Sequence, residues 1–168
     1  MRKLRITVLV IAGLLLVIVP SIGWYTRHYS MSVAKEFEVG DASLSPRVLI
    51  ATQGSAYKDA LVDGIVKHLK TRPAYVKVVD VSALPQVHDD DWNAIVVIHT
   101  WERWKPQPDA KAFVARIKDK KKLIVVTTSG SGEEAMPGVD AISGASVLKD
   151  VPTQVGRITA RLDALLGK

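Results

Sequence analysis

Short apolar runs alternate with amphipathic segments from Arg47 to the end of the 168-residue chain, and this alternation restricts the fold more than any other feature. The runs are apolar on both faces, as in strands that are buried on both sides of a parallel sheet. The intervening segments repeat their apolar residues at helical spacing, which gives each one buried face. We therefore predict strands at 48–52, 75–81, 94–99 and 123–127, a fifth short strand within 139–146, and helices at 55–71, 108–120 and 151–167.

This order of elements favours an α/β fold. Connections between parallel strands through a helix are right-handed crossovers, and such helices cover both faces of the sheet. We therefore expect a doubly wound parallel sheet of four or five strands. Ligands of such sheets bind at the carboxyl ends of the strands, near the point where the strand order reverses. Three loops should meet there: TQGSAYK at 52–58, HTWERWKP at 99–106 and TTSGSGEE at 127–134.

An uncharged stretch of 21 residues, 6–26, precedes the alternating part. At about 1.5 Å per residue it can span a hydrocarbon core of roughly 30 Å. It follows three cations and ends in aromatic residues that favour the membrane interface, namely Arg2, Lys3 and Arg5 before it and Trp24 and Tyr25 at its far end. We predict a single transmembrane anchor at 1–27, with the N-terminus in the cytoplasm and the domain across the membrane, in the periplasm of a Gram-negative host.

A cleaved signal peptide is the alternative for this stretch. Pro20 interrupts the apolar run, and Ser21-Ile22-Gly23 offers small residues before a cut. Residues 28–46 are polar and end in Ser45-Pro46, so we expect an extended stalk that links the anchor to a domain at 47–168.

Composition excludes several kinds of site. The absence of cysteine removes disulfides, thiolate ligands and a cysteine nucleophile. The four histidines are not paired at the spacing of a metal site, so we expect no metal. The net charge of +6 includes one basic run, 118–122, which is typical of a solvated helix end, and we therefore expect no nucleic acid as a partner.

The first loop has the composition of a phosphate cradle. Gly54 permits a tight turn, Thr52, Gln53 and Ser55 offer side-chain donors, and the N–H groups of the next helix point to the same place. The alternative is an ordinary strand-to-helix turn in which Ser55 caps the helix.

The other two loops suit a flat ligand resting on that cradle. Trp101 and Trp104 end the third strand, where an indole offers a planar face to an aromatic ring system. The alternative for both is packing against the next helix or against the membrane surface. Ser129, Gly130 and Ser131 supply hydroxyls and flexible backbone on the far side.

Residues 47–167 resemble the flavodoxin-like family by the order of elements, by the three loop positions and by phrases such as DWNAIVVIHTWERWKPQPDAKAFVARIKD. The resemblance implies that the first loop binds the phosphate of FMN and that the other two hold its isoalloxazine ring. Where the family's first loop carries further hydroxyls, this chain has Ala51, Gln53 and Ala56. Carried over by position, the FMN-binding residues are Thr52, Gln53, Gly54, Ser55, Thr100, Trp101, Trp104, Ser129, Gly130 and Ser131.

A second resemblance concerns DAISGAS, from Asp140 to Ser146. It is similar to the Asp-x-x-Ser-Gly-Ala-Thr motif of membrane-anchored, extracytoplasmic FMN-binding domains, and this implies an FMN carried covalently on Ser146. The alternative is a fifth strand that runs into a polar turn.

Two classes of function stay open at this stage. One is an FMN-binding redox module that transfers electrons near the membrane to a redox partner protein. The other is a binding or scaffold domain that kept the sheet without the cofactor. Glu102, Arg103 and Glu133 are acid–base groups near the expected crevice, but no residue stands out as catalytic.

Overall fold

The computed structural model describes residues 2–29 and 31–167 and divides into two compact units, 1–31 and 32–168. The first unit holds one helix, α1 (Arg2–Tyr29). Its segment Arg5–Trp24 is long and apolar enough to cross a membrane, and the side chains described in it are exposed. By length and composition, this helix fits either the anchor or the signal peptide that the sequence predicts.

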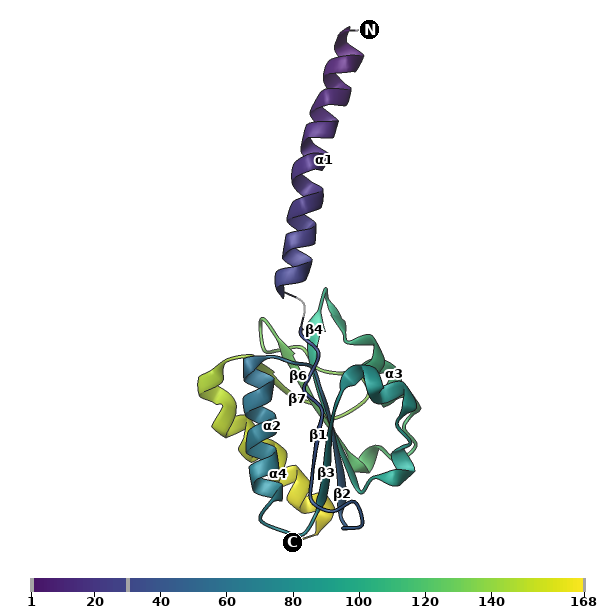
Figure 1. Ribbon diagram of the computed structural model, residues 1–168, viewed down its shortest axis with the longest axis vertical. Coiled ribbons are helices and arrows are strands. Elements are labelled where there is room, and N and C mark those ends of the chain that lie inside the picture. The colour runs from purple at the N-terminus through teal and green to yellow at the C-terminus, as the bar shows by residue number, and fades with distance from the viewer. Residues whose placement is uncertain (1, 30, 168) are drawn as a thin grey trace. The chain divides into compact units, whose positions relative to one another are not determined.

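The second unit is built on a mostly parallel sheet in which the strands lie in the order β1-β3-β2-β4-β6-β7 (Figure 1). Numbered along the chain, its five parallel strands lie in the order 2-1-3-4-5, so the strand order reverses between the first and the third. These strands are β2 (Arg47–Thr52), β3 (Tyr75–Asp80), β4 (Ala94–Glu102), β6 (Leu123–Ser129) and β7 (Ile142–Ala145).

Helices cover both faces of this sheet, as the alternation of the sequence predicts (Figure 1). On one face, α2 (Ala56–Leu69) and α4 (Val151–Leu166) pack on a core that includes Val48 and Ile50. On the other face, α3 (Pro108–Arg116) and a short 3-10 helix (Val81–Gln86) pack on a core that includes Leu49 and Ala51. Successive residues of β2 therefore point into opposite cores, which is why its sequence is apolar throughout.

The sheet is larger than the four or five strands predicted. It has seven, because β1 (Phe37–Val39) pairs antiparallel with β3 at one edge and β5 (Lys105–Pro106) pairs antiparallel with the end of β4. The sequence did not predict β1 and β5, because segments of three and two residues are too short to show the alternation of a strand. In addition, β5 contains Pro106, and a proline argues against a strand.

The sequence predicted an extended stalk at residues 28–46, but from Ser32 onward this segment is bonded to the domain. Ser32 and Gly54 form an antiparallel bridge, with N···O distances of 2.7 and 3.1 Å. Ala34 is buried, and its N–H donates to the carboxylate of Asp80 at 2.7 Å. Together with β1, these contacts make residues 32–46 part of the domain.

Helix α2 approaches α4 closely at Gly64, and this approach can be tested by substitution. A Cβ added at Gly64 would lie 2.6 Å from Cγ2 of Val155, whose branched side chain has little freedom to move. We expect Gly64→Ala to lower the free energy of unfolding by about 1–3 kcal/mol through overpacking. Urea denaturation of the detergent-solubilised protein, followed by circular dichroism, measures the change.

Gly156→Ala is the matched control, because a Cβ at this position in α4 meets nothing within 4 Å. It should raise the free energy of unfolding by up to about 1 kcal/mol, as alanine does in an open helical position. Equal effects of the two substitutions would contradict close packing at Gly64.

The topology predicted from the cations before α1 has its own test. A reporter enzyme fused after Lys168 should be active only if it is a type that works outside the cytoplasm. Activity of a reporter that works only in the cytoplasm would show that the domain stays inside.

Candidate functional site

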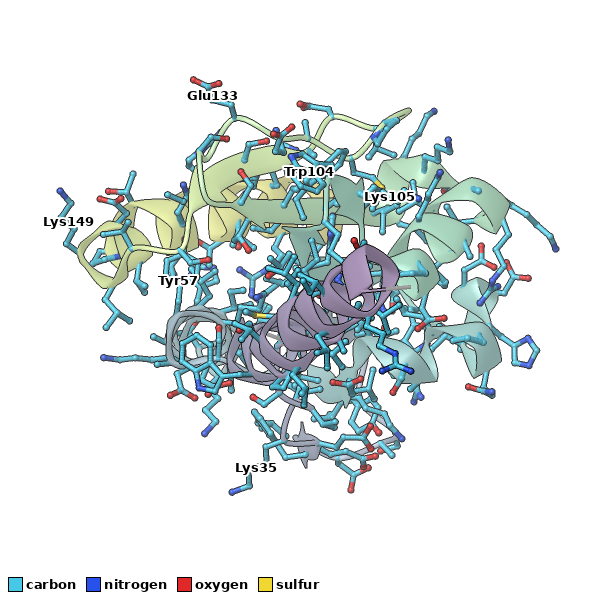
Figure 2. The ribbon with its side chains drawn as sticks, turned by 90° about the horizontal axis from the view of Figure 1, so that it is seen from above. Lys35, Tyr57, Trp104, Lys105, Glu133 and Lys149 are labelled. Carbon is cyan, nitrogen blue, oxygen red and sulfur yellow. The ribbon has the colours of Figure 1, made fainter. Side chains whose placement is uncertain are left out.

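The loops after β2, β4 and β6 gather at the carboxyl edge of the sheet, where the strand order reverses between β2 and β4. Figure 2 looks onto this edge. Tyr57 marks the start of α2, Trp104 the loop after β4, Glu133 the loop after β6 and Lys149 the turn after β7. The sequence therefore predicted correctly which loops share one edge of the domain.

The first loop is a helix cap closed by the chain itself. Ser55 is the N-cap of α2, and its Oγ accepts a hydrogen bond from the N–H of Lys58 at 3.2 Å. The hydroxyl of Thr52 donates to the carbonyl of Gln53 at 3.1 Å, and the N–H of Gly54 donates to the carbonyl of Ser32 at 2.7 Å. A Cβ at Gly54 would lie 2.6 Å from both Ser32 Oγ and the carbonyl oxygen of Val33. Glycine is needed at residue 54 because the segment that begins at Ser32 passes so close.

Gln53 extends the link between β2 and β4 beyond their last paired residues. Its Oε1 accepts a hydrogen bond from the N–H of Thr100 at 2.7 Å, and its Nε2 donates to Oε1 of Glu102 at 3.1 Å. The side chain is buried, so these bonds satisfy an amide that would otherwise be costly to remove from water. The structure thus brings Gln53 and Thr100 together, but as partners of each other.

A buried lysine completes this network. Lys58 lies in the first turn of α2 and is fully buried, and its Nζ donates to Oγ1 of Thr100 at 2.5 Å. Oγ1 of Thr100 is in turn 3.1 Å from Oγ1 of Thr128. Burial lowers the pKa of Lys58 to about 8, although the charges of Glu102 and Asp59 oppose this shift. The ammonium group therefore stays charged at neutral pH while held inside the protein.

The sequence analysis did not identify Lys58 as a buried residue of this site, although its position in α2 indicates it. The buried face of α2 contains Leu61, Val62, Ile65 and Leu69, and Lys58 lies on the same face one turn earlier. A cation within an apolar face near a helix N-terminus indicates a side chain that reaches past the core to a polar partner.

His99 is a second buried polar group at this edge. Its Nδ1 lies 3.2 Å from the carbonyl oxygen of Thr100, which only accepts, so Nδ1 carries the proton. Nε2 then accepts from the hydroxyl of Thr127 at 3.0 Å. Burial lowers the pKa of His99 to about 4; the bond to Thr100 opposes this shift and the charge of Lys58 adds to it. His99 is therefore neutral at physiological pH, and its two ring nitrogens bond to β4 and β6 within the sheet.

The second loop is a tight β-hairpin. Trp101 pairs with Pro106 and Glu102 with Lys105, which leaves Arg103 and Trp104 as a two-residue turn. Both turn residues have positive φ, 51° and 59°, as in a type I′ turn. Trp101 is half-buried at the base, whereas Trp104 is 90% exposed at the tip. Of the two tryptophans predicted to stack on a ligand, only Trp101 is partly buried.

The third loop makes its own turn. Oγ of Ser129 is buried and accepts from the N–H of Gly132 at 2.9 Å, and Oγ of Ser131 accepts from the N–H of Glu133 at 3.2 Å. Gly130 is exposed. Ser146 is also exposed and directly follows β7, which is the short fifth strand that the sequence predicted within 139–146.

Within residues 2–29 and 31–167, no group of three or more His, Asp or Glu side chains is arranged to hold a metal ion. What the edge does contain is a connected polar network of Gln53, Lys58, Thr100, Glu102 and Thr128. Its members bond to one another across the loop after β2, α2, β4 and β6. The arrangement can rigidify this edge of the sheet and hold one positive charge within it.

Comparison with known proteins identifies no family for this chain. No protein-family model and no curated protein sequence matches the chain. Among solved structures, an oxidoreductase from Corynebacterium diphtheriae is similar over 71% of this chain and 96% of its own, with 13% sequence identity and a TM-score of 0.46. A likeness at this level identifies neither a family nor an activity.

The buried charge of Lys58 predicts an unusual dependence of stability on pH. The folded pKa of about 8 lies below the ordinary lysine value of 10.5, so the unfolded chain binds more protons between these values and stability rises with pH. We expect the free energy of unfolding to gain about 2 kcal/mol from Lys58 between pH 7.5 and pH 9.5.

Lys58→Met keeps the length of the side chain and removes the charge. The free energy of unfolding of the wild type minus that of the variant should rise by about 2 kcal/mol over the same pH range, as measured by urea denaturation. A difference that does not change with pH would mean that Lys58 is solvated in the folded protein.

Proposed function

We propose that residues 32–168 form a flavodoxin-like binding domain that works at a membrane without FMN. The observation that carries this proposal is the pairing of Ser32 with Gly54 in the loop where a flavin phosphate would bind. The domain keeps the strand order 2-1-3-4-5 and the gathering of three loops at the switch point. It differs from an FMN-binding domain in that its own Ser32 pairs with the first loop, at Gly54.

Several donors of that loop are already engaged. A bound phosphate needs N–H and O–H groups that point at one place and have no other partner. The N–H of Gly54 bonds to Ser32, the hydroxyl of Thr52 bonds to Gln53, and both ends of the Gln53 amide bond to β4. Binding a phosphate there would exchange these bonds for bonds to the ligand, with no evident net gain.

The space next to Gly54 in the first loop is also occupied, by residues 32 and 33. Glycine in a phosphate loop allows close approach of the ligand to the backbone. Here, the atoms within 3.0 Å of a Cβ built at Gly54 belong to Ser32 and Val33. The chain's own backbone therefore lies where the ligand would approach.

The ring site is likewise incomplete. Trp104 is at the tip of a hairpin rather than on a wall of the crevice, and the hydroxyls of Ser129 and Ser131 accept bonds from their own loop. Trp101 alone could stack on an isoalloxazine. One aromatic contact is worth about 1–3 kcal/mol by analogy with nucleobases, which is too little to hold FMN without its phosphate site.

A second candidate is the FMN redox module implied by the family resemblance. The observation in its favour is that the loops after β2, β4 and β6 do share one edge at the switch point. In this case, residues 32–34 would have to leave the first loop for FMN to bind.

Titration with FMN distinguishes the two candidates. We expect the purified full-length protein to be colourless and to leave the fluorescence of added FMN unchanged at millimolar concentrations. Mass spectrometry of the intact chain should show no flavin attached at Ser146. Visible flavin absorbance that stays with the protein through gel filtration would refute the cofactor-free reading.

Ser32→Pro sharpens this experiment, because proline removes the N–H that donates to the carbonyl of Gly54. If the segment merely blocks a competent FMN site, the variant should gain affinity for FMN. The cofactor-free proposal expects no binding by this variant either. Val33→Ala is the control, since it leaves the backbone bonds intact and changes a side chain that is exposed.

A further inference from the structure

Large apolar side chains that are exposed in the domain gather at one end of it. Within residues 32–167, five such side chains are described, and four of them belong to the carboxyl edge of the sheet. These four lie on the segment paired with Gly54, on the β4–β5 hairpin and directly after β7; they are Val33, 78% exposed, Trp104, 90%, Val147, 39%, and Leu148, 58%. The fifth, Leu165, lies near the end of α4.

The hairpin presents Trp104 in a fixed position. Its two turn residues both adopt positive φ, a conformation that asparagine and glycine adopt at less cost than tryptophan or arginine. The turn is held at its base by the β4–β5 pairs and by the bond from Gln53 to Glu102. An exposed tryptophan in a strained, well-held turn indicates a role in contact with something outside the domain.

The charges beside this tryptophan are positive. Arg103 and Lys105 flank it in sequence, and both are exposed. Figure 2 shows Trp104 and Lys105 together at the hairpin and Glu133 on the neighbouring loop. An indole with cationic neighbours suits the interface of a bilayer, where the ring lies among the headgroups and the cations reach lipid phosphates.

The length of chain before the domain limits how far this edge can be from lipid. Only seven residues, 25–31, separate Trp24, at the end of the apolar segment, from Ser32, which is bonded to Gly54 at the same edge. Even fully extended, this stretch reaches at most about 30 Å. If α1 crosses the membrane, the tether joins the domain at this edge and keeps Ser32 within about 30 Å of the end of the apolar segment.

From these observations, we propose that the carboxyl edge of the sheet is a lipid-binding surface in which Trp104 enters the membrane interface. The partner is the bilayer surface, with anionic headgroups facing Arg103 and Lys105. The four exposed apolar side chains come from three separate segments and offer few anchors, whereas a stable protein partner buries about 800 Å² on each side. This inference does not depend on whether the domain binds FMN.

The absence of cysteine allows a direct test on the full chain. Glu133→Cys, labelled with an environment-sensitive dye, reports on the loop beside the hairpin after reconstitution into vesicles of phosphatidylcholine and phosphatidylglycerol. Asp91→Cys is the matched control, because Asp91 is also an exposed acid but precedes β4, at the other end of the sheet. Nitroxide lipids spin-labelled near the headgroup should quench the dye at residue 133 several-fold more than at residue 91.

Trp104→Asn in the Glu133→Cys background separates insertion from hairpin folding, because asparagine tolerates positive φ better than tryptophan. It should remove most of the difference in quenching between the two positions. Equal quenching at residues 133 and 91, or quenching that Trp104→Asn leaves unchanged, would overturn the proposal. Dye shielding that grows with protein density and not with nitroxide lipid would also overturn it, in favour of contact between copies of the chain.

Discussion

The side chain of Gln53 holds the carboxyl edge of the sheet together. Strands β2 and β4 are paired as far as Thr52 and Ile98, and beyond this point the amide of Gln53 replaces the backbone ladder by bonding to Thr100 and Glu102. Lys58 then joins Thr100 from α2. Because these bonds fix the base of the β4–β5 hairpin, they also fix where the hairpin points. In an ordinary doubly wound sheet, this place is open for a ligand, and here it is crossed by the protein's own polar contacts.

The parallel core of this fold could be predicted from sequence because the patterns that define it are local. Strands β2, β3, β4 and β6 are apolar on both faces, and α2, α3 and α4 each have one apolar face, so period and length were sufficient. Strand β1 was missed because its three residues lie in a polar segment and become a strand only by pairing with β3. The hairpin was missed because its turn is formed by Arg103 and Trp104, and neither is a residue that typically marks a type I′ turn.

The candidate site was less predictable than the parallel core, because it depends on contacts between residues that are far apart in the chain. That three loops meet follows from topology, which the sequence pattern indicates. Which donors are free in those loops depends on contacts between residues far apart in the chain, such as Ser32 with Gly54 and Gln53 with Thr100. Thr52, Gly54 and Ser55 have the composition of a cradle, but composition does not reveal that a distant segment fills it. The burial of Lys58 could have been inferred from its place on the apolar face of α2, whereas its partner on β4 could not.

The pairing of Ser32 with Gly54 has a mechanical consequence. Any pull on the chain from the side of α1 reaches the domain first at this bridge, then at the bond from Ala34 to Asp80, and then at the three pairs of β1 with β3. These bonds break one after another, ahead of the backbone ladders that join the parallel strands. Residues 32–46 would thus yield before the sheet does, and the first place uncovered by such a force would be the loop around Gly54.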